Sequence, residues 1–379
     1  MNKPLNAIQY LNMIQKQKGT EPSLDDLADY LDAKARKAGV PLSGQFELTP
    51  LCNFSCKMCY VHLMKDQLGE KNILTAAQWK LLMGQACEAG MVTATLTGGE
   101  CLAYPDFEDL YLYLQSQGCA VIVMTNGFLL DEERIRFFQA HRPSKIQITL
   151  YGSNDDVYEQ VTGQRAFGQV TRNIRSLIDA GILVTVSVTP NSYMGEDVLE
   201  TLRTAYSLCS NVRINPNLLK PREETGRSGI GDDLDLDQYV RLYRLEAELS
   251  GKELVNPFEG ELPEAGGSCC ECVRGMLCGG GRTSFAMNWK GIMTFCGSME
   301  AVCFDALKEG FPNAWKKLNQ AAKDWPNAPE CIGCAYESVC PTCSANEYHF
   351  AEPGKQPLPL CERTKYLVQH GVWNIPVCE

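Results

Sequence analysis

Short β-branched runs alternate six times with helical patterns along this chain, and the alternation constrains the fold more than any other feature. Strands that alternate with helices form parallel sheets joined by right-handed crossovers, with the chemistry at the carboxyl ends of the strands. We therefore predict an α/β domain over residues 44–250, either a partial (β/α)6 barrel or an open doubly wound sheet. The predicted strands cover 45–49, 92–97, 120–125, 145–150, 182–189 and 211–215, and the predicted helices lie near 75–89, 105–117, 131–140, 167–180, 196–208 and 236–250.

The pattern changes on both sides of this domain. Leu24, Leu27 and Leu31 recur at helical spacing, which predicts a helical lead-in over residues 1–43. After residue 251 the alternation stops, and twelve of the nineteen cysteines lie between positions 269 and 378. We predict a separate Cys-rich domain over residues 251–379 that buries too little apolar surface for a normal core and depends on metal.

Composition excludes several classes of protein. The net charge of −11 disfavours a nucleic-acid-binding surface, which needs a basic face. No apolar run reaches the roughly 18 residues of a membrane span, and the N-terminus lacks the apolar stretch of a signal peptide. We expect a cytoplasmic protein with no nucleic-acid or membrane partner. In a reducing compartment, clustered cysteines bind metal more often than they form disulfides.

Cys52, Cys56 and Cys59 follow the first predicted strand, with three residues and then two between them. Three thiolates on a short loop can hold three irons of a [4Fe–4S] cluster and leave the fourth iron open to a substrate or cofactor. A structural zinc site needs four closed ligands, and His62 is near enough in sequence to be the fourth. Zinc therefore stays an alternative from the spacing alone.

This motif resembles that of the radical S-adenosylmethionine (radical SAM) superfamily, and the resemblance covers roughly residues 44–250. It implies a partial (β/α)6 TIM-like barrel and a [4Fe–4S] cluster whose open iron chelates the amino and carboxylate groups of S-adenosylmethionine. One electron then breaks a C–S bond and yields a 5′-deoxyadenosyl radical. Met58 stands where the family usually has an aromatic residue near adenine, and a thioether can also cover a ring.

Positions at the ends of the later strands also resemble the family's cofactor site. Gly98, Gly99 and Glu100 resemble the motif that binds the methionyl amino group, although Cys101 follows where the family usually has Pro. Taken alone, each of these positions is as readily a turn or a structural residue. No catalytic base is identifiable. The resemblance implies cofactor-binding roles for Met58, Gly98, Gly99, Glu100, Thr125, Asn126, Thr149, Arg165 and Ser187.

The later cysteines suffice for two further four-ligand sites. From spacing alone, Cys331, Cys334, Cys340 and Cys343 would also make a plausible zinc site. Beside the first motif, the region resembles the SPASM extension of radical SAM enzymes, which carries two auxiliary [4Fe–4S] clusters. The last gap of the four-cysteine run is two residues here, where the family has three, and Cys269 or Cys270 could replace Cys272. The resemblance implies that Cys272, Cys278, Cys296 and Cys343 hold the inner cluster and Cys331, Cys334, Cys340 and Cys361 the outer one.

The SPASM resemblance points to peptide or protein substrates, and the chain looks most like the maturases of ribosomally made peptides (RiPPs). Such enzymes make thioether or carbon–carbon cross-links or oxidise side chains. The resemblance implies three [4Fe–4S] clusters, S-adenosylmethionine, a reductant such as flavodoxin or ferredoxin, and a peptide substrate. Residues 1–43 are too short for a winged-helix leader-binding domain, so we expect a separate protein or the acidic enzyme surface to bind a leader.

Three alternatives remain at this stage. A radical SAM enzyme acting on a small molecule or cofactor precursor is the first, and a non-catalytic iron–sulfur or zinc protein is the second. The third is formylglycine formation, as in the anaerobic sulfatase maturases, which use an Asp base directly after the second auxiliary cysteine. This chain has Gly297 at that position, which disfavours the activity. The sequence leaves open the bond formed, the fate of S-adenosylmethionine and the oligomeric state.

Overall fold

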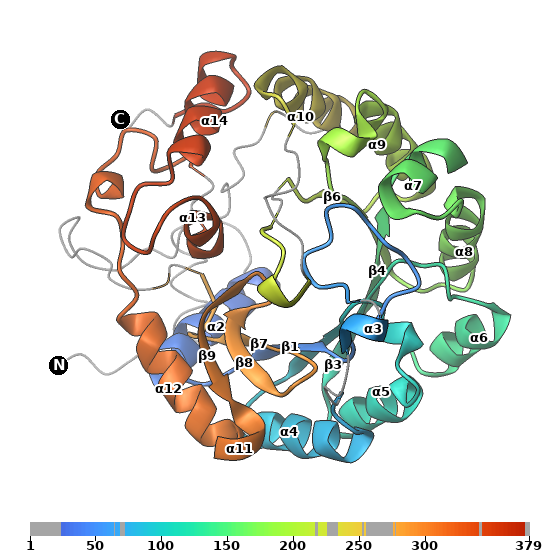
Figure 1. The fold of residues 1–379 in the computed structure, drawn as a ribbon, viewed down its shortest axis with the longest axis vertical. Coiled ribbons are helices and arrows are strands. Elements are labelled where there is room, and N and C mark those ends of the chain that lie inside the picture. The colour runs from blue at the N-terminus through green and yellow to red at the C-terminus, as the bar shows by residue number, and fades with distance from the viewer. Residues whose placement is uncertain are drawn as a thin grey trace.

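A computed structural model describes residues 24–63, 65–68, 73–216, 219–225, 234–251, 254, 276, 278–340 and 343–375 of the chain. Its central feature is a nine-stranded sheet with the order β6-β5-β4-β3-β2-β1-β7-β8-β9. The first six strands are parallel, and the helices form a ring outside the sheet (Figure 1). The fold is therefore an α/β partial barrel, as predicted. These strands are β1 (Ser43–Glu47), β2 (Thr93–Thr97), β3 (Ala120–Thr125), β4 (Lys145–Leu150), β5 (Val184–Val188) and β6 (Val212–Ile214).

Helices follow the strands as the alternating pattern predicts, and the predicted bounds lie within two residues of those observed. Capping explains several starts: Thr75 and Asp235 each form a capping box that satisfies the first backbone N–H groups of its helix. The helices up to residue 251 are α2 (Leu24–Ala38), α3 (Lys65–Leu68), α4 (Ala76–Glu88), α5 (Phe107–Ser116), α6 (Glu132–Ala140), α7 (Asp155–Thr162), α8 (Phe167–Asp179), α9 (Asp197–Leu208) and α10 (Leu236–Ser250).

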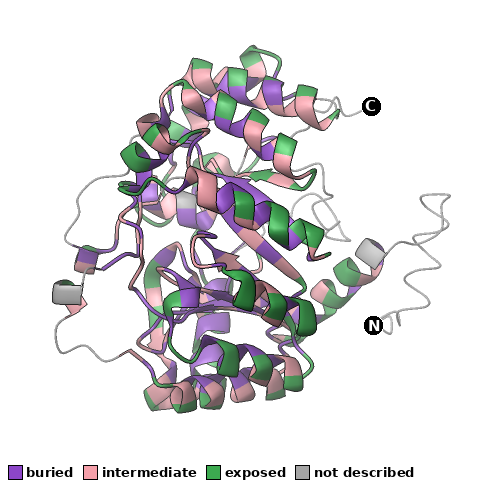
Figure 2. Cartoon of the chain, turned by 90° about the vertical axis from the view of Figure 1, so that its right-hand side faces the viewer, coloured by how far each residue is buried: buried purple, intermediate pink, exposed green. Residues whose placement is uncertain are grey.

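The strands of the barrel turn alternate side chains to opposite faces of the sheet. In β4, Ile146, Ile148 and Leu150 are fully buried, and α8 packs against this strand. Figure 2 shows the same division on the helices, whose outer surfaces carry the exposed residues and whose inner surfaces are buried. Thr149 alternates with this apolar set and pairs in register with Ser187 of β5. Both side chains therefore belong to the face of the sheet that points away from the helices.

Three more strands continue the sheet beyond β1. The strand β7 (Ser284–Met287) pairs parallel with β1, and β8 (Ile292–Cys296) and β9 (Met299–Asp305) follow in antiparallel order. Residues 251–379 were expected to lack a normal core, and this expectation is wrong for residues 284–325, whose side chains at Met287, Met293 and Phe295 are fully buried. The remaining helices are α11 (Ala306–Glu309), α12 (Phe311–Lys323), α13 (Ser344–Phe350) and α14 (Leu358–Gln369).

Phe285 joins the added strands to the barrel. Its ring lies 5.6 Å from Phe46, 5.0 Å from Phe311 and 6.1 Å from Trp315, between centroids. Its partner in the β1–β7 register is Gly44, where a Cβ atom would lie only 2.5 Å from the Phe285 ring. A glycine in β1 therefore makes the space that this ring fills.

Phe285→Ala should lower the free energy of unfolding by about 3–5 kcal/mol, because it leaves a cavity between three aromatic neighbours. Urea unfolding under anaerobic conditions measures the change. Leu183→Ala is the matched control, since this side chain is 57 % exposed and its loss should cost no more than about 0.5 kcal/mol. Equal effects of the two substitutions would contradict the assignment of Phe285 to the shared core.

Candidate active site

The loop that carries Cys52, Cys56 and Cys59 begins at the carboxyl end of β1 and is bonded to its neighbours on two sides. Backbone N–H groups of Gly99 and Glu100, after β2, donate to the carbonyls of Thr49 and Leu51 at 2.6 and 2.9 Å. On the other side, residues 55 and 57 donate to the last carbonyls of α7, at residues 162 and 161, over 2.9 and 3.0 Å. The loop therefore has a defined shape that does not depend on its cysteines alone.

Gly98 and Gly99 have a structural reason to be glycine. A Cβ atom at Gly99 would lie 2.4 Å from the carbonyl oxygen of Leu51 and 2.6 Å from that of Pro50. A Cβ at Gly98 would lie 2.5 Å from the carbonyl oxygen of Thr49, and its φ of +148° is one that other residues rarely adopt. These obstacles are backbone atoms, so the two glycines let the end of β2 pack directly against the cysteine loop.

The three thiols of the loop lie close enough to influence one another. Burial raises the pKa of Cys52 to about 12, and the neighbouring Glu100 and Cys59 add to the effect. Burial likewise raises the pKa of Cys56 well above its usual value, with smaller contributions from Cys59 and Cys52. The Cys52 and Cys59 sulfurs accept backbone N–H groups at 3.4 and 3.3 Å. Such donors favour the thiolate form that a metal requires, so they offset part of the cost of burying it.

The arrangement of these thiols also bears on which metal would fit. Ligands of one zinc ion would all lie about 2.3 Å from a single point. Within the described residues, no three His, Cys, Asp or Glu side chains are grouped so that they could hold a single metal ion. Thiols that bind different irons of one [4Fe–4S] cluster can lie further apart. The donor set of three thiols with N–H donors to two of them fits such a cluster.

Glu100, Thr125 and Asn126 form one buried network beside the loop. The Glu100 carboxylate accepts the Thr125 hydroxyl at 2.7 Å and the backbone N–H of Asn126 at 2.8 Å. Burial raises the pKa of Glu100, and these hydrogen bonds oppose that shift. The Asn126 side-chain amide donates to Asn53 at 2.8 Å and approaches the Cys52 sulfur at 3.6 Å. In this structure Glu100 therefore fixes Asn126, which in turn contacts the cysteine loop.

Other predicted cofactor-binding residues divide into two groups. Met58 is buried within the cysteine loop, and Thr149 and Ser187 lie side by side on adjacent strands. Arg165 lies apart on an exposed surface, where its guanidinium pairs with Asp156 at 2.6 Å and Glu159 at 3.0 Å. The structure thus does not bring Arg165 to the other candidates, and its role in binding stays a prediction.

Aromatic residues that the sequence analysis did not single out support the cysteine loop. The Phe54 ring meets those of Phe128, Tyr151 and Tyr158 edge-on at centroid distances of 5.6, 6.4 and 6.3 Å. The Tyr151 side chain also hydrogen-bonds to Cys56, which opposes the rise in the pKa of that thiol. Edge-to-face rings fix a geometry as well as burying area. In the sequence, Phe54, the aromatic residue between Cys52 and Cys56, is the one feature that could have indicated this support.

The later cysteines form two separate groups. Burial raises the pKa of Cys296 to about 12, with the charges of Cys343 and Cys278 adding to it. Burial also raises the pKa of Cys331 to about 11, with contributions from Glu347 and from the other described thiols of its group. Cys343 and Cys278 thus lie near Cys296, and the other three thiols of the predicted outer set lie near Cys331. That these thiols hold clusters stays a prediction, and Cys272 lies outside the described residues. The second group contains Cys331, Cys334, Cys340 and Cys361.

A buried ion-pair network near Cys296 was missed at the level of sequence. The Arg222 guanidinium binds both carboxylate oxygens of Glu47, at 2.7 and 2.8 Å, and lies 2.9 Å from the Glu300 carboxylate. Burial by itself would lower the pKa of Arg222, but the charges of Glu47 and Glu300 more than reverse this and raise it. The sequence carries no signal for this network, because Glu47 lies 175 positions away from Arg222.

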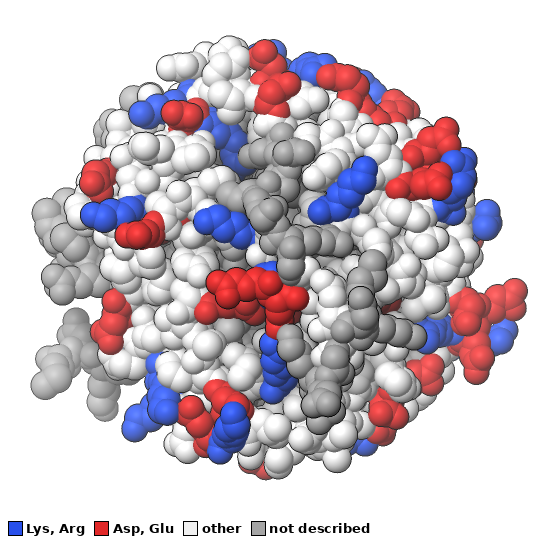
Figure 3. All heavy atoms as spheres, viewed as in Figure 1, with Lys and Arg blue, Asp and Glu red and all other residues white. Residues whose placement is uncertain are grey.

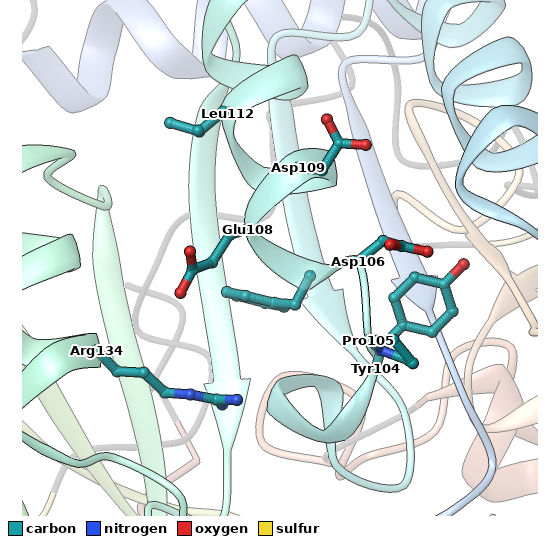
Figure 4. Close-up of a pocket in the computed structure, with 8 residues that line it drawn as sticks. Tyr104, Pro105, Asp106, Glu108, Asp109, Leu112 and Arg134 are labelled. Carbon is teal, nitrogen blue, oxygen red and sulfur yellow. The ribbon is translucent and has the colours of Figure 1, made fainter.

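Two surface features complete the description. A pocket of about 410 Å³ lies at the start of α5, where Glu108 and Arg134 project into it (Figure 4), and none of the predicted cysteine ligands line it. Acidic side chains gather near the centre of the face seen in Figure 3. Among the described residues, no helix is long and apolar enough to cross a membrane.

A partial barrel with three cysteines on the loop after its first strand is the arrangement that the radical SAM resemblance predicted. Residues 46–219, somewhat less than half of the chain, match the model described as the Radical SAM superfamily, so this segment is similar to a radical SAM domain. Such a domain uses S-adenosylmethionine and a [4Fe–4S] cluster.

Known relatives extend the match. The sporulation killing factor maturation protein SkfB of Bacillus subtilis is 27 % identical over 244 residues, which is 63 % of this chain but only 57 % of SkfB. The AdoMet-dependent heme synthase of Nitratidesulfovibrio vulgaris is 25 % identical over 83 % of this chain and 90 % of its own length. Among solved structures, Streptococcus suis SuiB bound to S-adenosylmethionine superposes with a TM-score of 0.64 at 15 % identity, covering 93 % of this chain and 87 % of SuiB. At that identity the structural likeness shows the fold alone.

Gly99→Ala should lower the free energy of unfolding by roughly 2 kcal/mol or more, because the new Cβ meets backbone atoms that cannot move aside cheaply. It should also reduce the iron bound by the loop after anaerobic reconstitution. Urea unfolding and iron analysis measure the two effects. Gly168→Ala is the control, since it lies in α8 with only the end of the Arg172 side chain near its Cβ position, and should change stability by less than about 0.5 kcal/mol. Equal behaviour of both variants would contradict the packing role of Gly99.

Proposed function

We propose that this chain is a radical SAM enzyme that modifies a peptide or protein substrate oxidatively, through a thioether or carbon–carbon cross-link or a related side-chain or backbone change. The observation that carries the proposal is the placement of its cysteines. Three thiols lie on a rigidly held loop at the carboxyl end of β1, and two further cysteine groups follow in the last third of the chain. The similarity to SkfB, a maturation protein, supports a peptide substrate.

In this proposal Cys52, Cys56 and Cys59 would hold the first cluster, which would supply the electron for reductive cleavage of S-adenosylmethionine. The chain's own residues position that chemistry. Asn126, fixed through Glu100, holds the loop at Cys52, and the buried thioether of Met58 would be available to pack against the adenine. Thr149 and Ser187 offer hydroxyl groups on the adjacent strands for the ribose and carboxylate.

We further propose two auxiliary [4Fe–4S] clusters, one on Cys272, Cys278, Cys296 and Cys343 and one on Cys331, Cys334, Cys340 and Cys361. Auxiliary clusters can accept an electron from a substrate radical, which makes the net reaction an oxidation. A flavodoxin or ferredoxin would supply electrons to the first cluster. We propose a separate leader-binding protein as partner and a cytoplasmic location, where thiols stay reduced.

The surroundings of Gly297 suit glycine better than the aspartate base of the anaerobic sulfatase maturases. A Cβ atom at Gly297 would lie 2.9 Å from the Gln45 amide nitrogen and 3.1 Å from a Glu47 carboxylate oxygen. An aspartate base at this position would therefore be pressed against another carboxylate. Glu47 cannot swing away without losing its two hydrogen bonds to Arg222.

A second candidate function is the modification of a small molecule or cofactor precursor. The observation in its favour is the heme synthase relative, which this chain matches over nearly its whole length. The two candidates differ in the product. Incubation of the reduced enzyme with S-adenosylmethionine and short peptides encoded near its gene, followed by mass spectrometry, should show peptides that have lost two hydrogen atoms. Consumption of S-adenosylmethionine with no change in any peptide mass would favour the small-molecule reaction.

Replacing Cys52, Cys56 and Cys59 together by Ala should abolish reductant-dependent 5′-deoxyadenosine formation while about two thirds of the iron is retained. Wild-type enzyme should bind about twelve irons, four in each of three clusters. Anaerobic reconstitution with iron analysis and chromatography of the nucleoside measure both quantities. The control is Cys209→Ala, since this thiol donates to the Val184 carbonyl and lies outside all three groups. Stoichiometric zinc in place of iron in wild-type protein would overturn the proposal.

A further inference from the structure

Arg222 is bonded to the backbone directly after two of the predicted cluster ligands. Its own backbone N–H donates to the carbonyl of Tyr60 at 3.1 Å, and Tyr60 follows Cys59. Its guanidinium donates to the carbonyl of Gly297 at 2.8 Å, and Gly297 follows Cys296. One residue thus spans the loop of the first predicted cluster and the loop of the inner auxiliary cluster.

The Arg222 guanidinium is buried and forms two hydrogen bonds to one buried carboxylate. Its side chain is 6 % exposed and that of Glu47 2 %, and the two form a pair of parallel hydrogen bonds. Paired hydrogen bonds between Arg and a carboxylate fix direction as well as distance. Because a buried charge that loses its partner is costly, the network has one arrangement that is strongly preferred. Glu47 is the last residue of β1, so the sheet anchors the Arg222–Glu47 ion pair, which we call the clamp.

Other groups around the clamp connect it to both loops. The Arg222 guanidinium lies over the Tyr60 ring, 5.5 Å from its centroid. Position 297 lies against the same ring, since a Cβ there would be 3.4 Å from the Tyr60 oxygen. On the outer side, Glu300 approaches Arg222, and Glu224, which pairs with Lys290, faces Glu300.

We propose that Arg222 is a positioning residue that fixes the Cys59 loop and the Cys296 loop relative to each other, with Glu47 as its anchor on the sheet. The inference rests on the proposed function, because it assigns cluster ligands to both loops. Arg222 does not bind a metal in this proposal. It sets the separation of the two cluster sites and places a buried positive charge between their loops.

The test uses the full-length chain in anaerobic buffer, both without iron and after reconstitution. Arg222→Gln removes both the charge and the paired hydrogen bonds to Glu47. Arg222→Lys keeps the charge but loses the paired hydrogen bonds. Arg241→Gln is the matched control, because Arg241 forms the same two-bonded pair with Glu196, at 2.7 and 2.8 Å, on the exposed surface. Hydrogen exchange read by mass spectrometry reports the backbone, and a redox titration followed by electron paramagnetic resonance reports the Cys296-side cluster.

In the iron-free chain, both Arg222 variants should speed amide exchange about tenfold or more in peptides covering 295–300, with little change in β3 and β4. Exchange in 57–63 should also rise, because the guanidinium packed over the Tyr60 ring is lost although the backbone N–H bond to Tyr60 remains. In the reconstituted enzyme, Arg222→Gln should shift the midpoint potential of the Cys296-side cluster to more negative values, because the extra electron loses a nearby positive charge. Arg222→Lys should shift it less, and Arg241→Gln should change neither readout.

Faster exchange in only one of the two segments, equal acceleration throughout the chain, or an unmoved potential in Arg222→Gln would overturn the proposal. If Arg222→Gln does not fold, Arg222→Lys and Glu300→Gln test the proposal in its place. Glu300→Gln leaves the ion pair between Arg222 and Glu47 intact, so it should speed exchange mainly in residues 295–300. A wild-type enzyme that binds no cluster or leaves S-adenosylmethionine intact would refute the proposed function, whereas the iron-free exchange experiment would still test the clamp.

Discussion

Close backbone packing between the end of β2 and the loop after β1 is the constraint on which the rest of the site depends. The carbonyls of residues 49 and 51 accept the N–H groups of residues 99 and 100, and the contact leaves no room for a Cβ at Gly98 or Gly99. This contact sets where the three thiols lie and brings Glu100 beside Thr125 and Asn126. A parallel sheet supplies the geometry, because successive strands deliver their carboxyl ends to one edge.

Strands β7, β8 and β9 bring later cysteines toward the same edge of the sheet. Parallel pairing of β7 with β1 carries the β8–β9 hairpin to the barrel, so that Cys296 comes near the first cysteine loop. The apolar contacts of Phe285 and Phe295 stabilise this extension. Clusters bound there would thus sit on a preformed support over residues 284–325. The buried Arg222 network then joins that support to the loop after β1 by directional bonds, which hydrophobic packing alone would not provide.

Sequence reasoning located most elements and the three-cysteine loop, because both signals are local. The period of the apolar residues gives helices and strands, and short spacings between cysteines reveal shared ligands. It failed where partners are remote. Nothing near Arg222 in the sequence points to Glu47, and the short runs of β7 and β8 were hidden among Gly and Cys residues with no helix between them. Arg165, chosen by resemblance, pairs with two nearby carboxylates on the surface.

By itself the sequence determined the fold class, the order of the first six strands with their helices, and the three-cysteine motif that ties the chain to radical SAM enzymes, since each follows from the chemistry of neighbouring residues. Only the tertiary structure decided that β1 pairs with β7, that Gly98 and Gly99 serve the packing of the cysteine loop, and that Arg222 spans two loops. These features arise from contacts between distant segments. Their energies depend on distances and burial that no local pattern encodes.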